Sequence, residues 1–321
     1  MKLVTFLSHG TERLGVLVGD RILDVERIAM MRSKVLPSDI LSFLRLGDVA
    51  METLHSVLAS LGSDGTFASF DVATTTLCAP VPRPTSMRDG YAFKQHVEAA
   101  RRNRGLDMIP EFYDIPIFYF TNHQAVYGPG DVPVMPMHED QLDFELECAI
   151  VIGKQGRNIS AADADAHVAG YMVMNDWSAR ALQMQEMKLN LGPAKGKDFA
   201  TSIGPWLVTR DELSARRIET PHGETYNMPM CTTLNGTEVS RGNVKDMTWT
   251  FAQIIERASY GVTLYPGDVI GSGTCGTGCF LELNGSKVYD PALWLKPGDV
   301  VTCAIDGLGN LTNTIVRETI S

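Results

Sequence analysis

The chain has 321 residues, of which 44% are hydrophobic and 21% are charged, and its formal net charge is -10. This composition excludes a disordered chain and supplies enough apolar side chains for a sizeable core. The apolar runs are short and interrupted, so neither a membrane-spanning helix nor a membrane partner is expected. Nucleic acid is not expected as a partner either, because an acidic surface repels phosphate backbones.

The first part of the chain is predicted to form a small α+β domain. Residues 1–35 alternate apolar and polar side chains between turns, which is typical of short strands. Residues 38–61 have helical spacing, with Ser38 as a candidate N-cap. A stretch rich in proline and polar residues then begins, so the sequence predicts domains at 1–77 and 78–321.

The second domain is predicted to be mostly β with few helices. Strand patterns do not alternate regularly with helix patterns, which excludes a doubly wound sheet. Residues 92–103, 160–168 and 178–187 have the character of short helices. The run LDFELECAIVIG, residues 142–153, alternates and then becomes wholly apolar, as expected of a strand that ends in the core.

The cysteines and the first residues predict a cytoplasmic protein. Among the six cysteines only Cys275 and Cys279 are close together, and one such pair lacks the partner pair of a zinc site. We expect buried free thiols in a reducing compartment. The beginning of the chain lacks the apolar core and cleavage site of a signal peptide and is typical of a first strand.

Three acidic residues share one face of the strand predicted for LDFELECA. Asp143, Glu145 and Glu147 are spaced by two, and side chains at this spacing project to the same side. Their charges repel one another unless water or a cation offsets them. A solvated strand face is the alternative interpretation, although the apolar residues that follow argue for burial. The spacing therefore indicates a candidate metal site.

Two further aspartates lie at positions where ligands are common. Asp176 lies where an apolar strand is predicted to end and a helix to begin, and its alternative role is the N-cap of that helix. Asp89 precedes Gly90, so its alternative role is that of a turn residue.

A histidine and a glutamate are candidates for proton transfer. His96 follows Asp89 by seven residues, and a lone histidine is more often structural or exposed than catalytic. Glu282 lies in the apolar segment CFLELNG, which we expect to be a strand, and its burial there requires a partner. The sequence by itself does not pair the two side chains.

Polar residues after Asp176 are candidates for substrate contacts. Arg180 and Gln183 are three residues apart and share one face of the predicted helix. Lys197 follows Gly196 in a loop, where a charged side chain can approach a ligand. The later glycine-rich turn matches neither phosphate-loop fingerprint, which argues against nucleotide binding.

The order and spacing of these residues together resemble the fumarylacetoacetate hydrolase family. The resemblance covers about residues 80–321, and the beginning of the chain also resembles that family's small N-terminal domain. It predicts a mixed β-roll or β-sandwich catalytic domain. The matching motifs are D-x-Y-x-x-x-x-H (Asp89–His96), E-L-E (Glu145–Glu147), NDWSARxxQ (Asn175–Gln183), GPxxGKxFxTSxGPW (Gly192–Trp206), GSGT (Gly271–Thr274) and L-E-L around Glu282.

The resemblance implies a cofactor and its ligands. Matching carboxylates in the family bind one divalent cation, so the cofactor would be Mg²⁺ or Ca²⁺, with Mn²⁺ as a further option. Asp143 is not one of the matching carboxylates, so it would either contact a ligand from outside the metal site or be solvated. The ligands implied by the matching positions are Asp89, Glu145, Glu147 and Asp176.

The resemblance also implies a water-activating pair and a substrate pocket. By the same matching, His96 and Glu282 would activate water. The family further implies a homodimer and a small diketo or 2-oxo acid substrate. The residues that would surround this substrate are Arg180, Gln183, Lys197, Tyr91, Tyr119 and Thr274.

The sequence departs from the animal fumarylacetoacetate enzymes in two respects. The chain is shorter, and the basic run Arg101, Arg102 and Arg104 is out of register by one with a carboxylate-binding arginine of that family. We therefore expect the acid end of the substrate to be recognised differently.

Three functions remain open at this point. The first is hydrolysis of a carbon–carbon bond in a 1,3-diketo acid such as fumarylacetoacetate or an acylpyruvate. The second is a lyase or isomerase on the same scaffold, such as a 2-keto-3-deoxy sugar acid dehydratase or a 2-oxo acid decarboxylase or isomerase. The third is a non-catalytic metal-binding protein, which would not need His96, Arg180 and Lys197 together.

Overall fold

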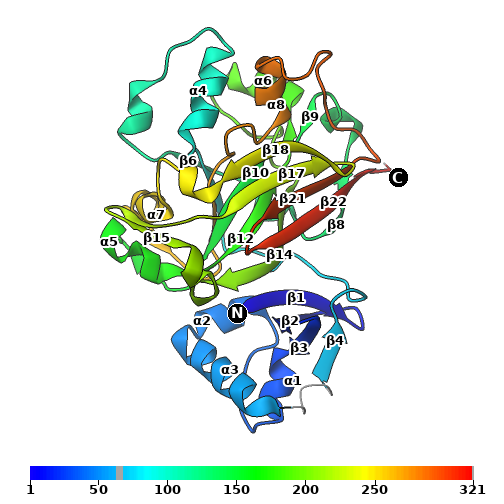
Figure 1. Ribbon diagram of the computed structural model, residues 1–321, viewed down its shortest axis with the longest axis vertical. Coiled ribbons are helices and arrows are strands. Elements are labelled where there is room, and N and C mark those ends of the chain that lie inside the picture. The colour runs from blue at the N-terminus through cyan, green and yellow to red at the C-terminus, as the bar shows by residue number, and fades with distance from the viewer. Residues whose placement is uncertain (63–67, 320–321) are drawn as a thin grey trace.

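A large mixed sheet forms the centre of the computed structural model, which describes residues 1–62 and 68–319. Within those residues the strand order is β4-β3-β2-β1-β14-β12-β10-β20-β5-β6, and β7 pairs with β14 (Figure 1). The strands are β1 (Lys2–Ser8), β2 (Thr11–Val18), β3 (Arg21–Asp24), β4 (Ser69–Asp71), β5 (Met87–Gly90), β6 (Phe118–Phe120), β7 (Val126–Tyr127), β10 (Leu146–Ile152), β12 (Val168–Asp176), β14 (Thr201–Thr209) and β20 (Val269–Gly271).

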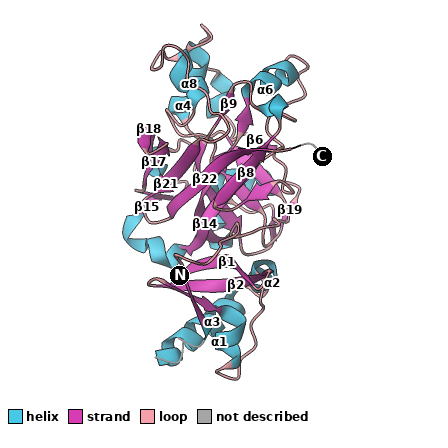
Figure 2. Ribbon diagram, turned by 90° about the vertical axis from the view of Figure 1, so that its right-hand side faces the viewer, coloured by secondary structure: helices cyan, strands magenta, loops and turns pink. Residues whose placement is uncertain are grey.

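A second sheet packs against the central one, in the order β18-β17-β21-β22-β8 (Figure 2). Its strands are β8 (Gly130–Val134), β17 (Pro229–Leu234), β18 (Thr237–Asn243), β21 (Val300–Ile305) and β22 (Gly309–Arg317). Three short pairs complete the described strands: β9 (Leu142–Asp143) with β13 (Ser178–Ala179), β11 (Gly156–Arg157) with β19 (Thr263–Leu264), and β15 (Arg217–Thr220) with β16 (Gly223–Tyr226).

The helices are short, and apart from α5 and α7, which lie beside the sheets, they gather at two ends of the molecule (Figure 1). Helices α1 to α3 cover the first strands, whereas α4, α6 and α8 lie together at the opposite end (Figures 1 and 2). The helices are α1 (Val25–Met30), α2 (Ile40–Arg45), α3 (Asp48–Leu61), α4 (Lys94–Arg102), α5 (Ala161–Ala164), α6 (Arg180–Met187), α7 (Phe251–Ser259) and α8 (Phe280–Gly285).

Strand β10 is buried on both faces because it separates two hydrophobic cores. Cys148 and Ile150 face the core shared with the second sheet and α7. Ala149 and Val151 face the core shared with α1, α2 and α3. This explains why the strand's sequence is continuously apolar after Glu147.

The structure confirms the predicted fold class, a mostly β protein with few helices. One local prediction was wrong: residues 38–61 form two helices, because Gly47 adopts a positive φ of 57° between them. The cap of the first helix is Asp39, whose side chain accepts from the Ser42 N–H, and not Ser38. All six cysteines are unpaired, although Cys78 and Cys231 are only half-buried.

The predicted boundary at residue 77 stays a prediction. Strand β1 pairs with β14, so the first strands continue the central sheet, and the two parts share one of the cores. In the part of the chain that the structure describes, no helix is both long and apolar enough to cross a membrane.

Candidate metal centre and active site

The central sheet brings together four acidic side chains that are far apart in the sequence. Asp176 ends β12, Glu147 is the second residue of β10, and Asp89 lies on β5. Glu147 pairs with Met174 in the β10–β12 ladder, and Gly271 on β20 pairs with Asp89. Because alternate residues share a face, these carboxylates project on the side of the sheet that carries Met87, Ala149 and Met174.

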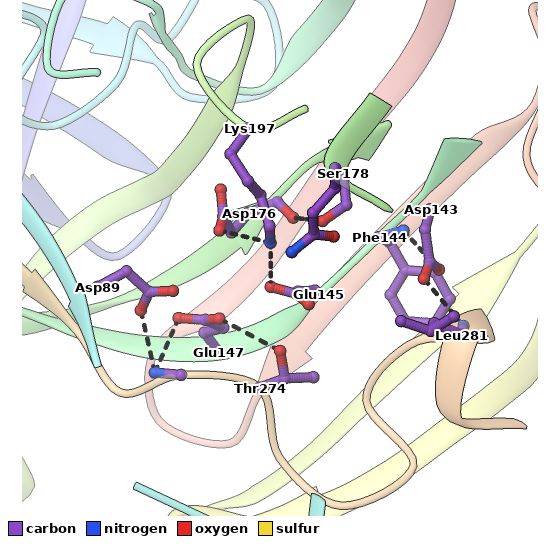
Figure 3. A network of polar contacts seen from close by, with 12 residues as sticks. Asp89, Asp143, Phe144, Glu145, Glu147, Asp176, Ser178, Lys197, Thr274 and Leu281 are labelled. Carbon is purple, nitrogen blue, oxygen red and sulfur yellow. Dashed lines mark hydrogen bonds and ion pairs between the residues drawn. The ribbon is translucent and has the colours of Figure 1, made fainter. Parts of the chain in front are cut away.

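The four carboxylates form one buried cluster. Asp89, Glu145, Glu147 and Asp176 each offer an oxygen, and these oxygens all lie within 4.8 Å of one another. All four side chains are buried, and Glu147 and Asp176 have no exposed surface. Figure 3 shows them pointing toward a common centre from three strands and the segment before β10. Buried like charges at this spacing are unfavourable unless cations or protons offset them.

Protein cations offset only one side of this cluster. The Lys197 ammonium donates to Glu145 Oε2 at 2.5 Å and to Asp176 Oδ2 at 2.8 Å, between the two carboxylates (Figure 3). Arg180 donates to Glu145 Oε1 at 2.7 Å. Burial works to raise the pKa of Glu145, but Lys197 and Arg180 outweigh it and lower that pKa to about 2.

The other side of the cluster lacks such compensation. Asp89 and Glu147 both accept from the Gly273 N–H, at 3.0 and 3.1 Å, and Thr274 donates weakly to Glu147 at 3.5 Å. Burial and the charge of Asp176 raise the pKa of Asp89 to about 7. Burial and the neighbouring Asp89 raise the pKa of Glu147 well above its ordinary value. This half of the cluster therefore favours an added positive charge.

Two further observations fit a cation at this place. Asp176 Oδ1 is buried and has no hydrogen-bond partner. A Cβ on Gly271 would lie 2.4 Å from Asp89 Oδ1 and 2.9 Å from Glu147 Oε2, so only glycine leaves room for the two carboxylates. An all-oxygen donor set is the kind that hard cations such as Mg²⁺, Ca²⁺ and Mn²⁺ prefer.

A histidine–glutamate pair lies beside the cluster. His96 on α4 places Nδ1 2.7 Å from Glu282 Oε2, and both side chains are buried. The ring also comes close to Glu145 and Cys279, since one ligand atom of each lies within 4.8 Å of the others. Glu282 lies on helix α8, so the expectation of a strand there was wrong. The structure thus brings together His96 and Glu282, which the sequence by itself did not pair.

Comparison with known proteins identifies the family. The model of the fumarylacetoacetate (FAA) hydrolase C-terminal domain matches residues 85–316. The chain belongs to the fumarylacetoacetate hydrolase family. A human relative, the mitochondrial oxaloacetate tautomerase FAHD2A, is 33% identical over 88% of this chain and 81% of its own length.

Solved structures of the family have the same fold. Fumarylacetoacetate hydrolase from Exiguobacterium antarcticum is 26% identical, with a TM-score of 0.74 over 99% of this chain and 100% of that one. Maleylpyruvate hydrolase from Sphingobium sp. SYK-6, solved with manganese(II) and pyruvate, is 22% identical, with a TM-score of 0.69 over the same shares. At 22% identity, the similarity to the maleylpyruvate hydrolase shows a shared fold and no more.

The residues expected to contact substrate surround the cluster. Arg180 and Gln183 share a face of α6, as predicted, and the guanidinium donates to the Gln183 amide oxygen at 3.0 Å. Tyr91 packs edge-on against His96, with ring centroids 5.8 Å apart, and its burial raises its pKa to about 12. The Tyr119 hydroxyl donates to Asp176 Oδ2 at 2.5 Å, so it contacts a carboxylate of the cluster.

The basic run lies at the end of helix α4. Arg101 donates to the Asp107 carbonyl, and Arg104 donates to the Ala100 carbonyl, both at the exposed end of α4. Arg102 is exposed as well.

Two alternative roles considered for the acidic residues do not occur. Asp89 lies within strand β5 and not in a turn, and the N-cap of α6 is Ala179 and not Asp176. Asp143 does not share the face of Glu145 and Glu147, because the extended segment breaks between β9 and β10.

Family membership by itself did not reveal three supporting contacts. Asn175 accepts from the Glu145 N–H at 2.9 Å, and Asp143 is fully buried against Arg180. Cys279 lies beside the histidine. The conflict between an acidic residue and its apolar neighbours was the available signal for Asp143, whereas nothing in the local sequence marks Cys279.

Proposed function

We propose that the chain is a metal-dependent tautomerase that interconverts the keto and enol forms of a small 2-oxo dicarboxylate such as oxaloacetate. The observation that carries the proposal is the buried His96–Glu282 pair beside the four-carboxylate cluster. A keto–enol conversion needs a group that removes a proton from carbon and returns it. The reaction named for the 33% identical human relative supports the same chemistry.

The histidine would move the proton. Because a carboxylate accepts hydrogen bonds, Nδ1 of His96 carries its hydrogen toward Glu282, which leaves Nε2 free to take a proton from C3 of the substrate. As the C3–H bond breaks, its electron pair forms the C2=C3 double bond. The former carbonyl oxygen becomes the enolate oxygen and takes up the proton that Nε2 of the imidazolium returns, directly or through water, which gives the enol and neutral His96. Glu282 stabilises the imidazolium formed in between.

The cations beside Glu145 would stabilise the enolate. The pKa of Lys197 is raised because neighbouring carboxylates outweigh its burial, so the ammonium stays charged. Lys197 and Arg180 are held in place before the reaction, and fixed charges of this kind favour a developing oxyanion. A divalent cation bound to Asp89, Glu145, Glu147 and Asp176 would polarise the 2-oxo group and make the C3–H more acidic.

The direct test follows the enol absorbance and the NMR signals of oxaloacetate with purified protein and Mg²⁺, Mn²⁺ or Ca²⁺. We expect metal-dependent acceleration in both directions, lost on chelation and in His96→Gln. His167→Gln is the matched control, because His167 contacts the Lys154 carbonyl away from the cluster. An unchanged rate in His96→Gln would overturn the role given to this residue.

Hydrolysis of a carbon–carbon bond is the second candidate. The same His96–Glu282 pair could remove a proton from water, and the 26% identical structure is that of a fumarylacetoacetate hydrolase. Under this hypothesis, a fumarylacetoacetate- or acylpyruvate-like diketo acid would be split into two acids. If such a substrate is cleaved while oxaloacetate is left at its uncatalysed rate, the hydrolase replaces the tautomerase.

The native metal, the homodimer and the cytoplasmic location stay predictions from the sequence. The candidates are Mg²⁺, Ca²⁺ and Mn²⁺, because each of them prefers an all-oxygen donor set.

A further inference from the structure

Asp143 joins three elements of the site. Its carboxylate is fully buried and accepts from the Phe280 N–H at 2.7 Å and the Leu281 N–H at 2.9 Å, at the beginning of α8. It also accepts from Arg180 Nε on α6 at 2.8 Å. In Figure 3, Asp143 points away from the four-carboxylate cluster and toward Leu281. It is therefore not a ligand of the cluster, although it lies only two residues before Glu145.

Each of these contacts fixes a group that the proposed reaction uses. With Nε held by Asp143, the guanidinium of Arg180 directs its other nitrogens toward Glu145 and Gln183. The two N–H groups at the start of α8 set the direction of a helix whose third residue is Glu282. The Asp143 carboxylate thus positions both Arg180, which would contact the substrate, and Glu282, the partner of His96.

We propose that Asp143 is a positioning residue that fixes the His96–Glu282 pair relative to the carboxylate cluster. The proposal rests on the proposed function, in which His96 transfers the proton. Positioning of this kind affects the rate, because a misplacement of about 1 Å can lower turnover about a hundredfold.

A purely structural role is the competing explanation, and the chain contains a matched control for it. Asp24 is also fully buried and also accepts from an arginine, Arg13, at 2.5 and 2.9 Å. It also accepts a backbone N–H, that of Arg27, at the beginning of a short helix. Asp24 lies in the N-terminal region, residues 1–77, and contacts no residue of the candidate site.

The test compares Asp143→Asn with Asp24→Asn in the full-length protein. We expect Asp143→Asn to lower kcat for oxaloacetate about a hundredfold, with a much smaller change in KM. Nitrogen-15 NMR of the histidine rings gives a second measurement, assigned with His96→Gln. In the wild type, His96 should be held as the Nδ1–H tautomer, whereas in Asp143→Asn it should become a mixture. Asp24→Asn should lower the melting temperature and change neither quantity.

The outcomes distinguish a failure of the positioning role of Asp143 from a failure of the proposed function. If Asp143→Asn only lowers the melting temperature, as Asp24→Asn does, the positioning role is wrong. If the wild type does not act on oxaloacetate, the proposed function fails, and the His96 tautomer still decides the role of Asp143. If Asp143→Asn does not fold, Asp143→Glu keeps the charge opposite Arg180. Its longer side chain should displace α8 and produce the same tautomer mixture, and a fixed tautomer would again overturn the proposal.

Discussion

The N-terminal region and the carboxylate cluster both bury acidic side chains, but they compensate the charge differently. Asp24 has Arg13 against both of its oxygens, and a second arginine, Arg27, lies 3.6 Å away. The negative charge of Asp24 is thus compensated by side chains of the protein alone. In the cluster, Lys197 and Arg180 contact only two of the four buried carboxylates, Glu145 and Asp176. This leaves Asp89 and Glu147 buried with no cation of the described residues against them, which is a cost to stability that a bound cation would remove.

The largest effect is expected from Glu147→Gln, which removes one of the two uncompensated charges. We expect Mn²⁺ affinity and metal-dependent activity to fall by more than about a hundredfold. Losing an outer partner of a metal ligand already costs up to about a hundredfold, and Glu147 would itself be a ligand. The metal-free variant should nevertheless melt at a higher temperature than the metal-free wild type, because burial of the Glu147 carboxyl beside Asp89, which raises its pKa well above the ordinary value, no longer costs stability. Electron paramagnetic resonance of bound Mn²⁺ and calorimetry measure the two effects. Unchanged Mn²⁺ affinity would show that the cluster is not the metal site.

A smaller loss of activity is expected from Glu282→Gln. The amide does not stabilise the His96 imidazolium as a carboxylate does, so kcat should fall about a hundredfold, near the lower end for general acid–base catalysis. Mn²⁺ affinity should not change, because Glu282 lies outside the four carboxylates. Steady-state kinetics and Mn²⁺ titration of the same preparation check both points. A parallel loss of metal binding would contradict the separation of the two groups.

Asp24→Asn should affect stability and leave activity unchanged. Breaking a buried ion pair from one side typically costs about 3–5 kcal/mol, and the value here should lie at the lower end because the partly buried Arg13 keeps Glu26 as a partner. Urea denaturation should therefore show a large loss in the free energy of unfolding, with wild-type kcat in the folded protein. A fall in kcat would mean that the N-terminal region influences the site.

The smallest effect is a pH dependence of the metal-free protein. The folded state raises the pKa of Asp89 from 3.8 to about 7, so between these values it holds a proton that the unfolded chain releases. The stability of the metal-free protein should then fall as the pH rises through this window, and the raised pKa of Glu147 acts in the same direction. Melting temperatures with and without saturating Mg²⁺ test this, because the bound cation should flatten the decline. A metal-free protein that becomes more stable from pH 5 to 7 would contradict the assignment.

The sequence predicted the composition of the site better than its geometry. The motifs identified the four carboxylates, the histidine and the cations, because each motif is local. The sequence could not predict that Asp143 faces away from Glu145, since this depends on a break after β9, whose partner β13 is distant in the chain. Asp89 resembled a turn residue because its short strand forms by pairing with β6 and with β20, both later in the chain, and β20 lies more than 150 residues away. Tertiary pairing overrode the local preference in both cases.

The continuity of the central sheet has a consequence for self-association. Lys2 and Leu3 of β1 pair with Val208 and Leu207 of β14, and β14 also borders the strand that carries Asp176. Without the first strands, backbone groups of β14 would be left unpaired, and the buried Leu207 would lose part of its cover. An open, apolar sheet edge is a template for pairing with another chain. The N-terminal strands therefore protect the sheet of the candidate site from aggregation, although they contribute none of its ligands.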